Sequence, residues 1–440
     1  MNQGEHAELS RRFAELHPAL TVAEALSEAN RCLYCFDAPC AQACPTHIDV
    51  ASFIKKISTG NLRGSAATIL EANVLGLSCS RVCPVDVLCE GACVLHRQQM
   101  RPIEIGRLQR HAMDYFYSHD PALPVGEPKP GKIACIGSGP ASMACAAELR
   151  RYGHRVTIFD KRELPGGLNT YGVAEYKFTA SESLRETDLV RDAGVDFRQN
   201  ADVGTDLSIE WIEAQFDAVF IGVGLGPTNS LGVPGERLKG VVDALHFISE
   251  YKQGRPHTGR RVVVIGGGNT AIDAAIASCR LGAEEVRMLY RRGEKEMPAF
   301  AFEFAHARQE GVLFDFFTLP VAIHGEGAVS SIECVRMELG AAEMGDRTVA
   351  RAVPGSNFVI ECDMVVTSIG QTKLVDLLAQ YRGLQLDGGR VVVDPDTGQT
   401  TNPRYFAGGD CVNGGREVVD AVAGGKRAAT GIVAWLERYG

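Results

Sequence analysis

This sequence has no long hydrophobic run, no excess of basic charge and no leader-like start. No stretch approaches the roughly 18 consecutive apolar residues that a membrane-spanning helix needs. Residues 1–6 are polar and lack the apolar region of a signal peptide. There are 45 Lys and Arg against 54 Asp and Glu, a net charge of −9, without the basic clusters that neutralise nucleic-acid phosphates. These absences predict a cytoplasmic protein with no nucleic-acid and no membrane partner.

Cysteine is the abundant and unusual residue. Of the 14 cysteines, eight lie between residues 32 and 93 and the other six are scattered singly. In a reducing compartment such a dense block indicates metal ligation before it indicates disulfides. The two runs read Cys32-x2-Cys35-x4-Cys40-x3-Cys44-Pro45 and Cys79-x3-Cys83-Pro84-x5-Cys89-x3-Cys93.

The proline after Cys44 and after Cys83 is typical of ferredoxins, where the cysteine before proline binds the other of two clusters. We therefore expect two 4Fe–4S clusters. The expected ligands of the first are Cys32, Cys35, Cys40 and Cys93, and those of the second are Cys44, Cys83 and Cys89, with Cys79 as a candidate for its fourth ligand. Structural zinc is the alternative, but zinc sites usually show paired short spacings.

Short helices should carry these runs. Thr21 and Glu24 form a capping-box pattern before a helix toward Asn30. Residues 49–58 and 62–72 have helical composition, with Gly60 and Gly76 as expected stops. The proline-rich segment 121–131 predicts a domain boundary.

A dinucleotide-binding pattern follows this segment. The apolar residues 133–136 run into a glycine turn and then a helix, an arrangement that brings backbone N–H groups to a pyrophosphate. The expected turn residues are Gly137, Gly139, Pro140 and Ala141. A second strand, 155–159, ends in Asp160, which should accept from an adenosine ribose. Gly166, Gly167 and Leu168 would let the backbone pass close to a bulky cofactor, or simply form a turn.

The pattern occurs a second time, which implies a second dinucleotide. After the apolar residues 261–265 come Gly266, Gly268, Asn269, Thr270 and Ala271. The next strand, 285–290, ends in Arg291 and Arg292, where arginine accommodates the 2′-phosphate of NADP. A solvated surface pair is the alternative, because arginine is mostly exposed.

The last part of the sequence is expected to complete the first site. Gly409 and Asp410 follow a short apolar segment, and the carboxylate can accept from a polyol hydroxyl. The start of the next helix, at Glu417, Val418 and Val419, could stabilise negative charge on a reduced flavin. The predicted fold is α/β: a helical double-cluster domain (1–125), an FAD-binding domain in two parts (131–235 and 362–440) and an inserted NAD(P)-binding domain (236–361).

The sequence resembles the flavoprotein reductases that carry two dinucleotides and an N-terminal two-cluster domain. This group includes the glutamate synthase small subunit and the N-terminal half of dihydropyrimidine dehydrogenase. The resemblance rests on the cysteine runs and on residues 137–141, 266–271 and 407–410. Residues 31–35, 38–40, 44–46 and 102–109 resemble the dihydropyrimidine dehydrogenase branch, including the flavin subunit of its bacterial NAD-dependent members.

The resemblance implies FAD in the discontinuous domain, NADH and possibly NADPH in the inserted one, and Gln109 in place of Cys79 as the fourth ligand of the second cluster. It also implies a heteromer in which this chain passes electrons from NADH through FAD and the clusters to an FMN- and iron–sulfur-containing subunit that reduces uracil or thymine. The cofactors carry the hydride and electron transfer, so no catalytic side chain is expected.

Three alternatives remain open. The small subunit of glutamate synthase, or a related NAD(P)H–acceptor oxidoreductase, would use the same chemistry with another partner. A scaffold that binds the cofactors without turnover belongs to another class. Disulfide reduction is disfavoured because Cys135, Cys145, Cys279, Cys334, Cys362 and Cys411 form no pair in the sequence.

Overall fold

The computed structural model describes residues 11–119, 121–340 and 350–439. The chain forms two compact units. Of these described residues, the larger unit holds those in the ranges 15–170, 177–225 and 373–439. The smaller unit holds those in the range 226–372 with two short additions, residues 11–14 and 171–176. None of the helices in the described ranges is both long and apolar enough to span a bilayer.

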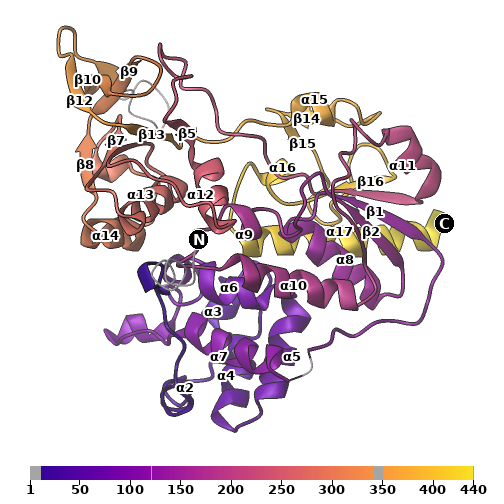
Figure 1. Cartoon of the computed structure of the whole chain (residues 1–440). Coiled ribbons are helices and arrows are strands. Elements are labelled where there is room, and N and C mark those ends of the chain that lie inside the picture. Colours follow the sequence, from indigo (N-terminus) through magenta and orange to yellow (C-terminus); the bar gives the residue numbers. More distant parts are fainter. Residues whose placement is uncertain (1–10, 120, 341–349, 440) are drawn as a thin grey trace. The chain divides into compact units, whose positions relative to one another are not determined.

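The first part of the larger unit is helical and contains both cysteine runs (Figure 1). Its elements are α2 (Val22–Ala29), α3 (Pro39–Gln42), α4 (Val50–Ser58), α5 (Leu62–Ala72), α6 (Gly76–Val82), the 3₁₀ turns η1 (Val85–Val87) and η2 (Val94–Gln98), and α7 (Ile105–Tyr117). Thr21 and Glu24 form the expected capping box at α2. Gly76, expected to stop a helix, instead begins α6, because the extended Asn73 has already ended α5.

The rest of the larger unit is built on a parallel sheet with the order β16-β4-β1-β2-β3. Its strands are β1 (Lys132–Ile136), β2 (Arg155–Phe159), β3 (Asp196–Arg198), β4 (Ala218–Ile221) and β16 (Tyr405–Ala407). Its helices are α8 (Pro140–Arg151), α9 (Leu168–Tyr171), α10 (Ala180–Asp192), α11 (Ile209–Gln215), α15 (Val375–Leu378), α16 (Asp410–Asn413) and α17 (Val418–Tyr439), with a small hairpin of β14 (Leu386–Asp387) and β15 (Arg390–Val391).

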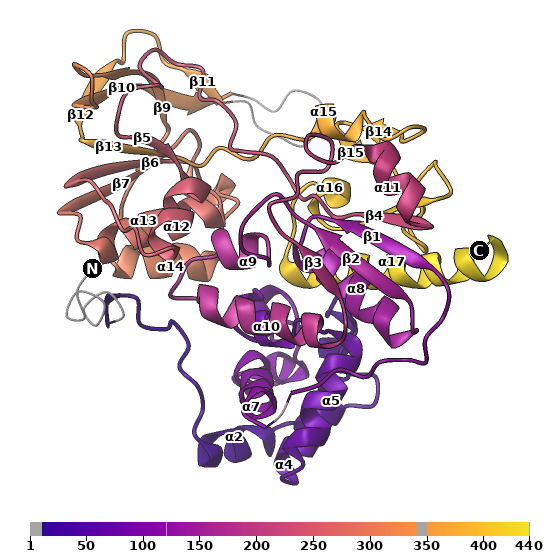
Figure 2. The ribbon, with the colours of Figure 1, turned by 45° about the vertical axis from the view of Figure 1, so that its right-hand side comes forward.

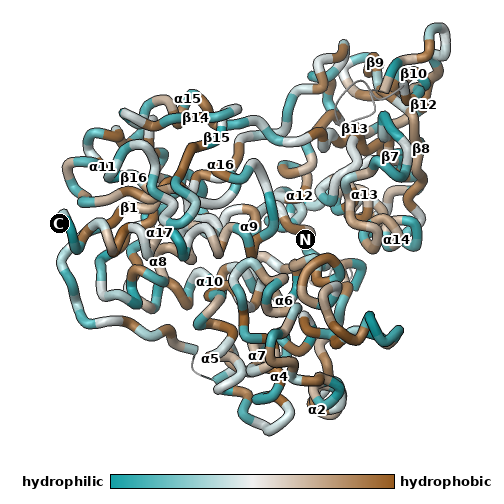
Figure 3. The backbone as a smooth tube through the Cα atoms, turned by 180° about the vertical axis from the view of Figure 1, so that it is seen from behind, coloured by the Kyte–Doolittle hydropathy of each residue, from teal (hydrophilic) through white to brown (hydrophobic). Residues whose placement is uncertain are grey.

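Helices α8 and α17 pack closely on each other, and their apolar faces form one core with the sheet (Figure 2). Ile133 and Cys135 of β1 belong to this core, whereas Ala134 and Ile136 pack in a second core on the other face of the sheet. Figure 3 colours the backbone by hydropathy. Val74 and Leu75, from the cysteine-bearing part, are buried in the first of these cores. The two parts of the larger unit therefore share apolar packing.

The smaller unit has a second parallel sheet with the order β5-β13-β6-β7-β8 and an antiparallel group of strands. The parallel strands are β5 (Val241–Asp243), β6 (Arg261–Ile265), β7 (Glu285–Tyr290), β8 (Leu313–Phe316) and β13 (Met364–Thr367). The antiparallel strands are β9 (Thr318–His324), β10 (Ser331–Leu339), β11 (Ala350–Ala352) and β12 (Phe358–Glu361). The helical elements are α12 (Ala244–Lys252), α13 (Asn269–Leu281), α14 (Ala301–Gln309) and the 3₁₀ turn η3 (Glu294–Glu296).

The architecture expected from the sequence, a helical part with the cysteine runs followed by two Rossmann-like parts, is confirmed. The boundaries between the two units differ from those expected at residues 236 and 362. Strand β13 pairs with β6 and β5, so residues 362–372 belong to the smaller unit and not to the returning FAD part. The crossing near residue 226 also comes before the expected boundary at 236. A buried parallel strand can join any sheet that offers it an edge, and its sequence does not say which.

Candidate functional site

The four expected ligands of the first cluster line one cavity. Cys32 follows α2, Cys40 lies in α3, and Cys93 precedes η2. Their thiols and that of Cys35 share the cavity with apolar side chains that include those of Val50, Ile54, Leu95, Ile103 and Ile105. Burial raises the pKa of the Cys40 thiol to about 11 and also raises the pKa of Cys32. Thiols crowded in an apolar cavity fit a cationic iron–sulfur core, because only metal binding would favour their thiolates there.

The other expected ligands lie together on the same part of the chain. Cys83 ends α6, and its pKa is raised by a hydrogen bond with the Cys79 side chain, by burial and by the neighbouring Cys89 and Cys44. Burial likewise raises the pKa of Cys89. This set fits a second cluster, and its composition remains a prediction.

Both candidates for the fourth ligand of that cluster are buried, Cys79 within α6 and Gln109 against its first residue. Cys79 is 3 % exposed and contacts Cys83, whereas Gln109 of α7 is 7 % exposed and donates from Nε2 to the Gly76 carbonyl at 2.9 Å. Because Nε2 makes this hydrogen bond, the amide oxygen is the atom that Gln109 could offer to a metal. Cys79 therefore contacts the predicted ligand Cys83, and Gln109 contacts the helix that Cys83 ends. The identity of the fourth ligand stays a prediction.

Among the described residues, no group of three or more His, Cys, Asp or Glu side chains is arranged to hold a single metal ion. A four-iron cluster spreads its thiolates around a larger core than one ion does. The absence of such a group among the described residues therefore applies to sites for one metal ion and not to sites for a cluster.

The first glycine turn lies at the carboxyl edge of the sheet of the larger unit. Gly137 has a φ of +89°, and a Cβ there would lie 2.6 Å from the Gly222 carbonyl oxygen, whereas a Cβ on Gly139 would meet open space. Helix α8 has no side-chain cap at Gly139, and its first internal hydrogen bond comes from Met143. The N–H groups of Ala141 and Ser142 at this helix start suit a pyrophosphate.

The loop with Gly166, Gly167 and Leu168 lies directly on this turn. The Gly166 N–H donates to the Ser138 carbonyl at 3.1 Å, and a Cβ on Gly167 would lie 2.8 Å from the Gly139 Cα. Asp160 follows β2 and also holds the turn, since its Oδ2 accepts from the Ser138 N–H at 2.7 Å and from the Ser138 hydroxyl at 2.6 Å. A carboxylate has about four acceptor sites in all, so Asp160 can still accept from a ribose.

The last part of the chain completes this edge. Gly409, with a φ of +75°, approaches Ala141, and Asp410 begins α16 directly after β16. Burial raises the pKa of Asp410, whose Oδ1 accepts from the Arg416 N–H at 3.2 Å. A polyol hydroxyl would give this buried carboxyl a further donor. The N–H groups of Val418 and Val419 precede the first internal bonds of α17, which Asp420 and Ala421 donate to Glu417.

The second glycine turn, in the smaller unit, has the same construction. A Cβ on Gly266 would lie 2.2 Å from the Ser368 carbonyl oxygen, and one on Gly268 would meet open space. The first bonds of α13 come from Ala271 and Ile272, so the N–H groups of Asn269 and Thr270 precede them. The Asn269 side chain accepts from the Phe300 N–H at 3.0 Å and braces the turn. This helix start suits a second pyrophosphate.

Arg291 and Arg292 follow β7 at the same edge of this sheet. Arg291 is exposed, and the Arg292 Nε is buried without a hydrogen-bond partner among the described residues. A buried donor without a partner costs free energy, and a phosphate would satisfy it. Arg292 therefore has a donor that a 2′-phosphate would satisfy, and the assignment of the pair to a 2′-phosphate stays a prediction.

Three cysteines of the FAD-binding part, Cys135, Cys145 and Cys411, are buried. The side chains of Cys135 in β1 and Cys145 in α8 contact each other, and both are fully buried. Burial raises the pKa of Cys145, and it raises that of Cys411 to about 12. Because the thiolate is the reactive form of a thiol, burial lowers the reactivity expected of Cys145 and Cys411.

Two known protein families match this chain. Residues 9–121 match the family described as dihydropyrimidine dehydrogenase domain II, 4Fe-4S cluster, and residues 131–425 match the pyridine nucleotide-disulphide oxidoreductases. The chain belongs to the pyridine nucleotide-disulphide oxidoreductase family. It is an oxidoreductase with an N-terminal iron–sulfur domain of the dihydropyrimidine dehydrogenase type.

This oxidoreductase is 35 % identical over 446 residues to the glutamate synthase (NADPH) small chain of Escherichia coli, covering 97 % of this chain and 94 % of that one. It is 36 % identical over 439 residues to the NADPH-Fe(3+) oxidoreductase subunit beta of Geobacter sulfurreducens, covering 91 % and 64 %. Among solved structures, Mycobacterium tuberculosis FprA in complex with NADPH has a TM-score of 0.59 at 22 % identity, covering 70 % of this chain and 85 % of that one. At that identity the likeness concerns the fold alone.

Sequence reasoning missed the polar contacts that join the oxidoreductase's cysteine-bearing helices to α10. Arg81, Asp114, Glu182 and Glu186 carry no motif, and no local signal in the sequence pairs them. They enter below.

Proposed function

We propose that this oxidoreductase is an electron-input subunit that oxidises NADH, with NADPH as a second donor, and delivers the electrons to a partner subunit. The observation that carries the proposal is the presence of two glycine-turn sites and a block of clustered, buried thiols in one chain. When bound, FAD would supply the change from two-electron to one-electron transfer, and two 4Fe–4S clusters would supply one-electron carriage.

Each glycine turn would bind one dinucleotide. The turn at Gly137, with Asp160 and Asp410, would bind and orient FAD. The turn at Gly266 would bind the nicotinamide dinucleotide, and Arg291 and Arg292 would accept a 2′-phosphate when NADPH is the donor. The cysteine block would hold the clusters, with the ligand sets expected from the sequence.

For the partner, we propose an FMN- and iron–sulfur-containing subunit that reduces uracil or thymine to the 5,6-dihydropyrimidine. The support is the likeness of the cysteine-bearing part to dihydropyrimidine dehydrogenase domain II. The second candidate is a glutamate-forming partner, favoured by the similarity to the glutamate synthase small chain.

Two experiments test this function. Anaerobic mixing of the purified chain with NADH and, separately, NADPH should bleach the flavin absorbance. A flavin that stays oxidised would support the scaffold alternative and contradict the proposal.

The second experiment identifies the partner. Proteins that co-purify with the chain from the native cell should reduce uracil with NADH, whereas glutamate formation would support the second candidate. Uracil reduction at full rate by the chain alone would contradict the need for a partner.

A further inference from the structure

Helix α10 presents one face to the cysteine-bearing helices. Glu182, Arg185 and Glu186 stand at positions i, i+3 and i+4, so they share a face of this helix. The helix follows the FAD-binding loop in sequence, and Figures 1 and 2 both draw it beside the cysteine-bearing part. None of these three side chains belongs to the sites described above.

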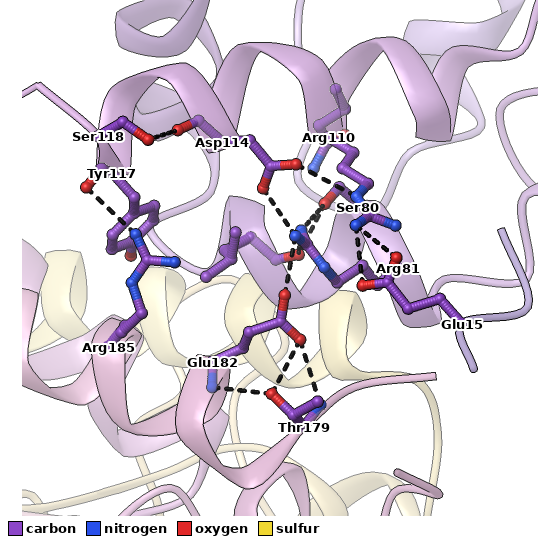
Figure 4. A network of polar contacts seen from close by, with 12 residues as sticks. Glu15, Ser80, Arg81, Arg110, Asp114, Tyr117, Ser118, Thr179, Glu182 and Arg185 are labelled. Carbon is purple, nitrogen blue, oxygen red and sulfur yellow. Dashed lines mark hydrogen bonds and ion pairs between the residues drawn. The ribbon is translucent and has the colours of Figure 1, made fainter. Parts of the chain in front are cut away.

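The first contact is an ion pair with Arg81 of α6. Arg81 stands between Cys79 and Cys83, and its side chain is 5 % exposed. Its guanidinium lies 2.9 Å from Glu182 Oε1 and 2.7 Å from Asp114 Oδ1 (Figure 4). Because Asp114 lies in α7, this buried cation joins α6, α7 and α10.

The second contact caps α6. The helix has no side-chain cap of its own at Leu75, and Glu186 Oε1 accepts from the Ser78 N–H at 2.9 Å. Glu186 is 1 % exposed. An acceptor from another helix thus satisfies one of the N–H groups that every helix start leaves open.

The third contact holds the end of α7. The Arg185 guanidinium lies over the Tyr117 ring, 5.0 Å from its centroid, and donates to the Tyr117 carbonyl at 3.1 Å (Figure 4). Helix α7 also carries Gln109. The face of α10 therefore contacts both helices that bear candidate ligands of the second cluster.

We propose that Glu182 and Glu186 are positioning residues for electron transfer, holding α6 and with it Cys83 at a fixed place relative to the FAD-binding part. This inference rests on the proposed function. Cys83 ends α6, two residues after Arg81, so a shift of the helix moves this predicted ligand directly. One-electron transfer weakens steeply with separation, and residues that orient metal ligands are typically worth 10- to 100-fold in affinity or activity.

The test uses the full-length chain, purified anaerobically with its cofactors. The variants are Glu182→Ala and Glu186→Ala, singly and combined. Glu186→Gln is the conservative variant, because its amide oxygen can still accept from the Ser78 N–H. Asp188→Ala is the matched control, since this carboxylate lies on the same helix but is 57 % exposed and pairs with Arg191.

The measurements are the iron and sulfide content, the electron paramagnetic resonance spectrum after reduction with dithionite, and the rates of flavin and cluster reduction after rapid mixing with NADH. We expect the combined variant to keep its rate of flavin reduction, to show an altered spectrum for one cluster, and to reduce its clusters about 10- to 100-fold more slowly. Glu186→Gln and Asp188→Ala should match the unaltered chain.

Two results would overturn the inference: cluster reduction and spectra unchanged in the combined variant, or loss of flavin reduction in step with loss of cluster reduction. If the combined variant fails to fold, the single variants decide by the same criteria. If the flavin of the unaltered chain is not reduced by NADH or NADPH, the proposed function fails, and the dithionite spectra still test the positioning.

Discussion

Arg292 leaves a buried Nε without a hydrogen-bond partner in the described ranges, at the strand end where we propose that the adenosine ribose binds. We expect this side chain, with Arg291, to influence which dinucleotide is favoured. A bidentate arginine–phosphate contact is among the stronger polar interactions in proteins.

Replacing Arg291 and Arg292 together by alanine should therefore lower kcat/KM for NADPH by about 10- to 100-fold, corresponding to about 1.5–3 kcal/mol of charge-assisted hydrogen bonding. The value for NADH should change little. Steady-state assays with both donors measure this, with Arg260→Ala, an exposed arginine at the opposite edge of the sheet, as the control. An equal loss with both donors would contradict the assignment.

Glu186 predicts a pH dependence of stability. Burial raises its pKa to about 7, although hydrogen bonds from Ser78 lower it, and the charged and titratable groups that face it are Arg81 and Tyr117. The pKa of an unfolded glutamate is about 4.3. Between these values the folded state binds more protons than the unfolded state, so stability falls as the pH rises through this window, by at most about 4 kcal/mol.

Glu186→Gln removes the charge and keeps the acceptor. Its thermal unfolding midpoint should match that of the unaltered chain near pH 5 and exceed it increasingly toward pH 8. Thermal scans across this range measure the difference. A difference that is constant with pH would contradict the raised pKa.

Cys79 and Gln109 give different expectations as fourth ligands. If Gln109 is the ligand, as the resemblance implies, Cys79→Ser should keep the iron content of both clusters, and Gln109→Leu should change the resonance spectrum of one. The opposite outcome would identify Cys79. Cys135→Ser, in the apolar core of the FAD part, is a control for the loss of a buried thiol.

At the scale of elements, the close packing of α17 on α8 positions the start of α8, where we expect FAD to bind. A Cβ on Gly425 would lie 2.1 Å from the Ala141 carbonyl oxygen and 3.0 Å from the Cys145 backbone nitrogen. Only glycine permits this approach, and Ala141 belongs to the predicted pyrophosphate turn.

Gly425→Ala should push the two helices apart, cost about 1–3 kcal/mol and lower the FAD content. The flavin-to-protein absorbance ratio and the thermal unfolding midpoint measure this. Thr430→Ala, at an exposed position of the same helix, should leave both unchanged. A Gly425→Ala chain with full FAD content would contradict this account of the packing of α17 on α8.

At the scale of the whole molecule, the cysteine-bearing part and the FAD-binding part form one compact unit. Leu75 is fully buried in the core that contains β1 and α8. The larger unit is thus predicted to depend on both parts for its stability.

Leu75→Ala should lower the stability of the FAD-binding part by about 2–5 kcal/mol, although the residue lies more than 50 positions before the glycine turn. Flavin fluorescence during thermal unfolding measures this, since free flavin is released when the site opens. Val125→Ala, in the linker, is an exposed control. Flavin release at an unchanged temperature would show that the parts are independent.

The sequence alone determined the features that depend on neighbouring residues. The capping box at Thr21, the two strand–glycine–helix turns and the cysteine runs follow from local backbone preferences and spacing. These fixed the fold class and the chemistry to expect.

Tertiary structure decided what depends on distant residues. It assigned β13 to the second sheet, brought Cys32, Cys35, Cys40 and Cys93 around one cavity, and paired Arg81 with Glu182 and Ser78 with Glu186. Such contacts join segments up to about a hundred residues apart, and their partners are set by the packing of whole helices and sheets, which leaves no trace in the local sequence pattern.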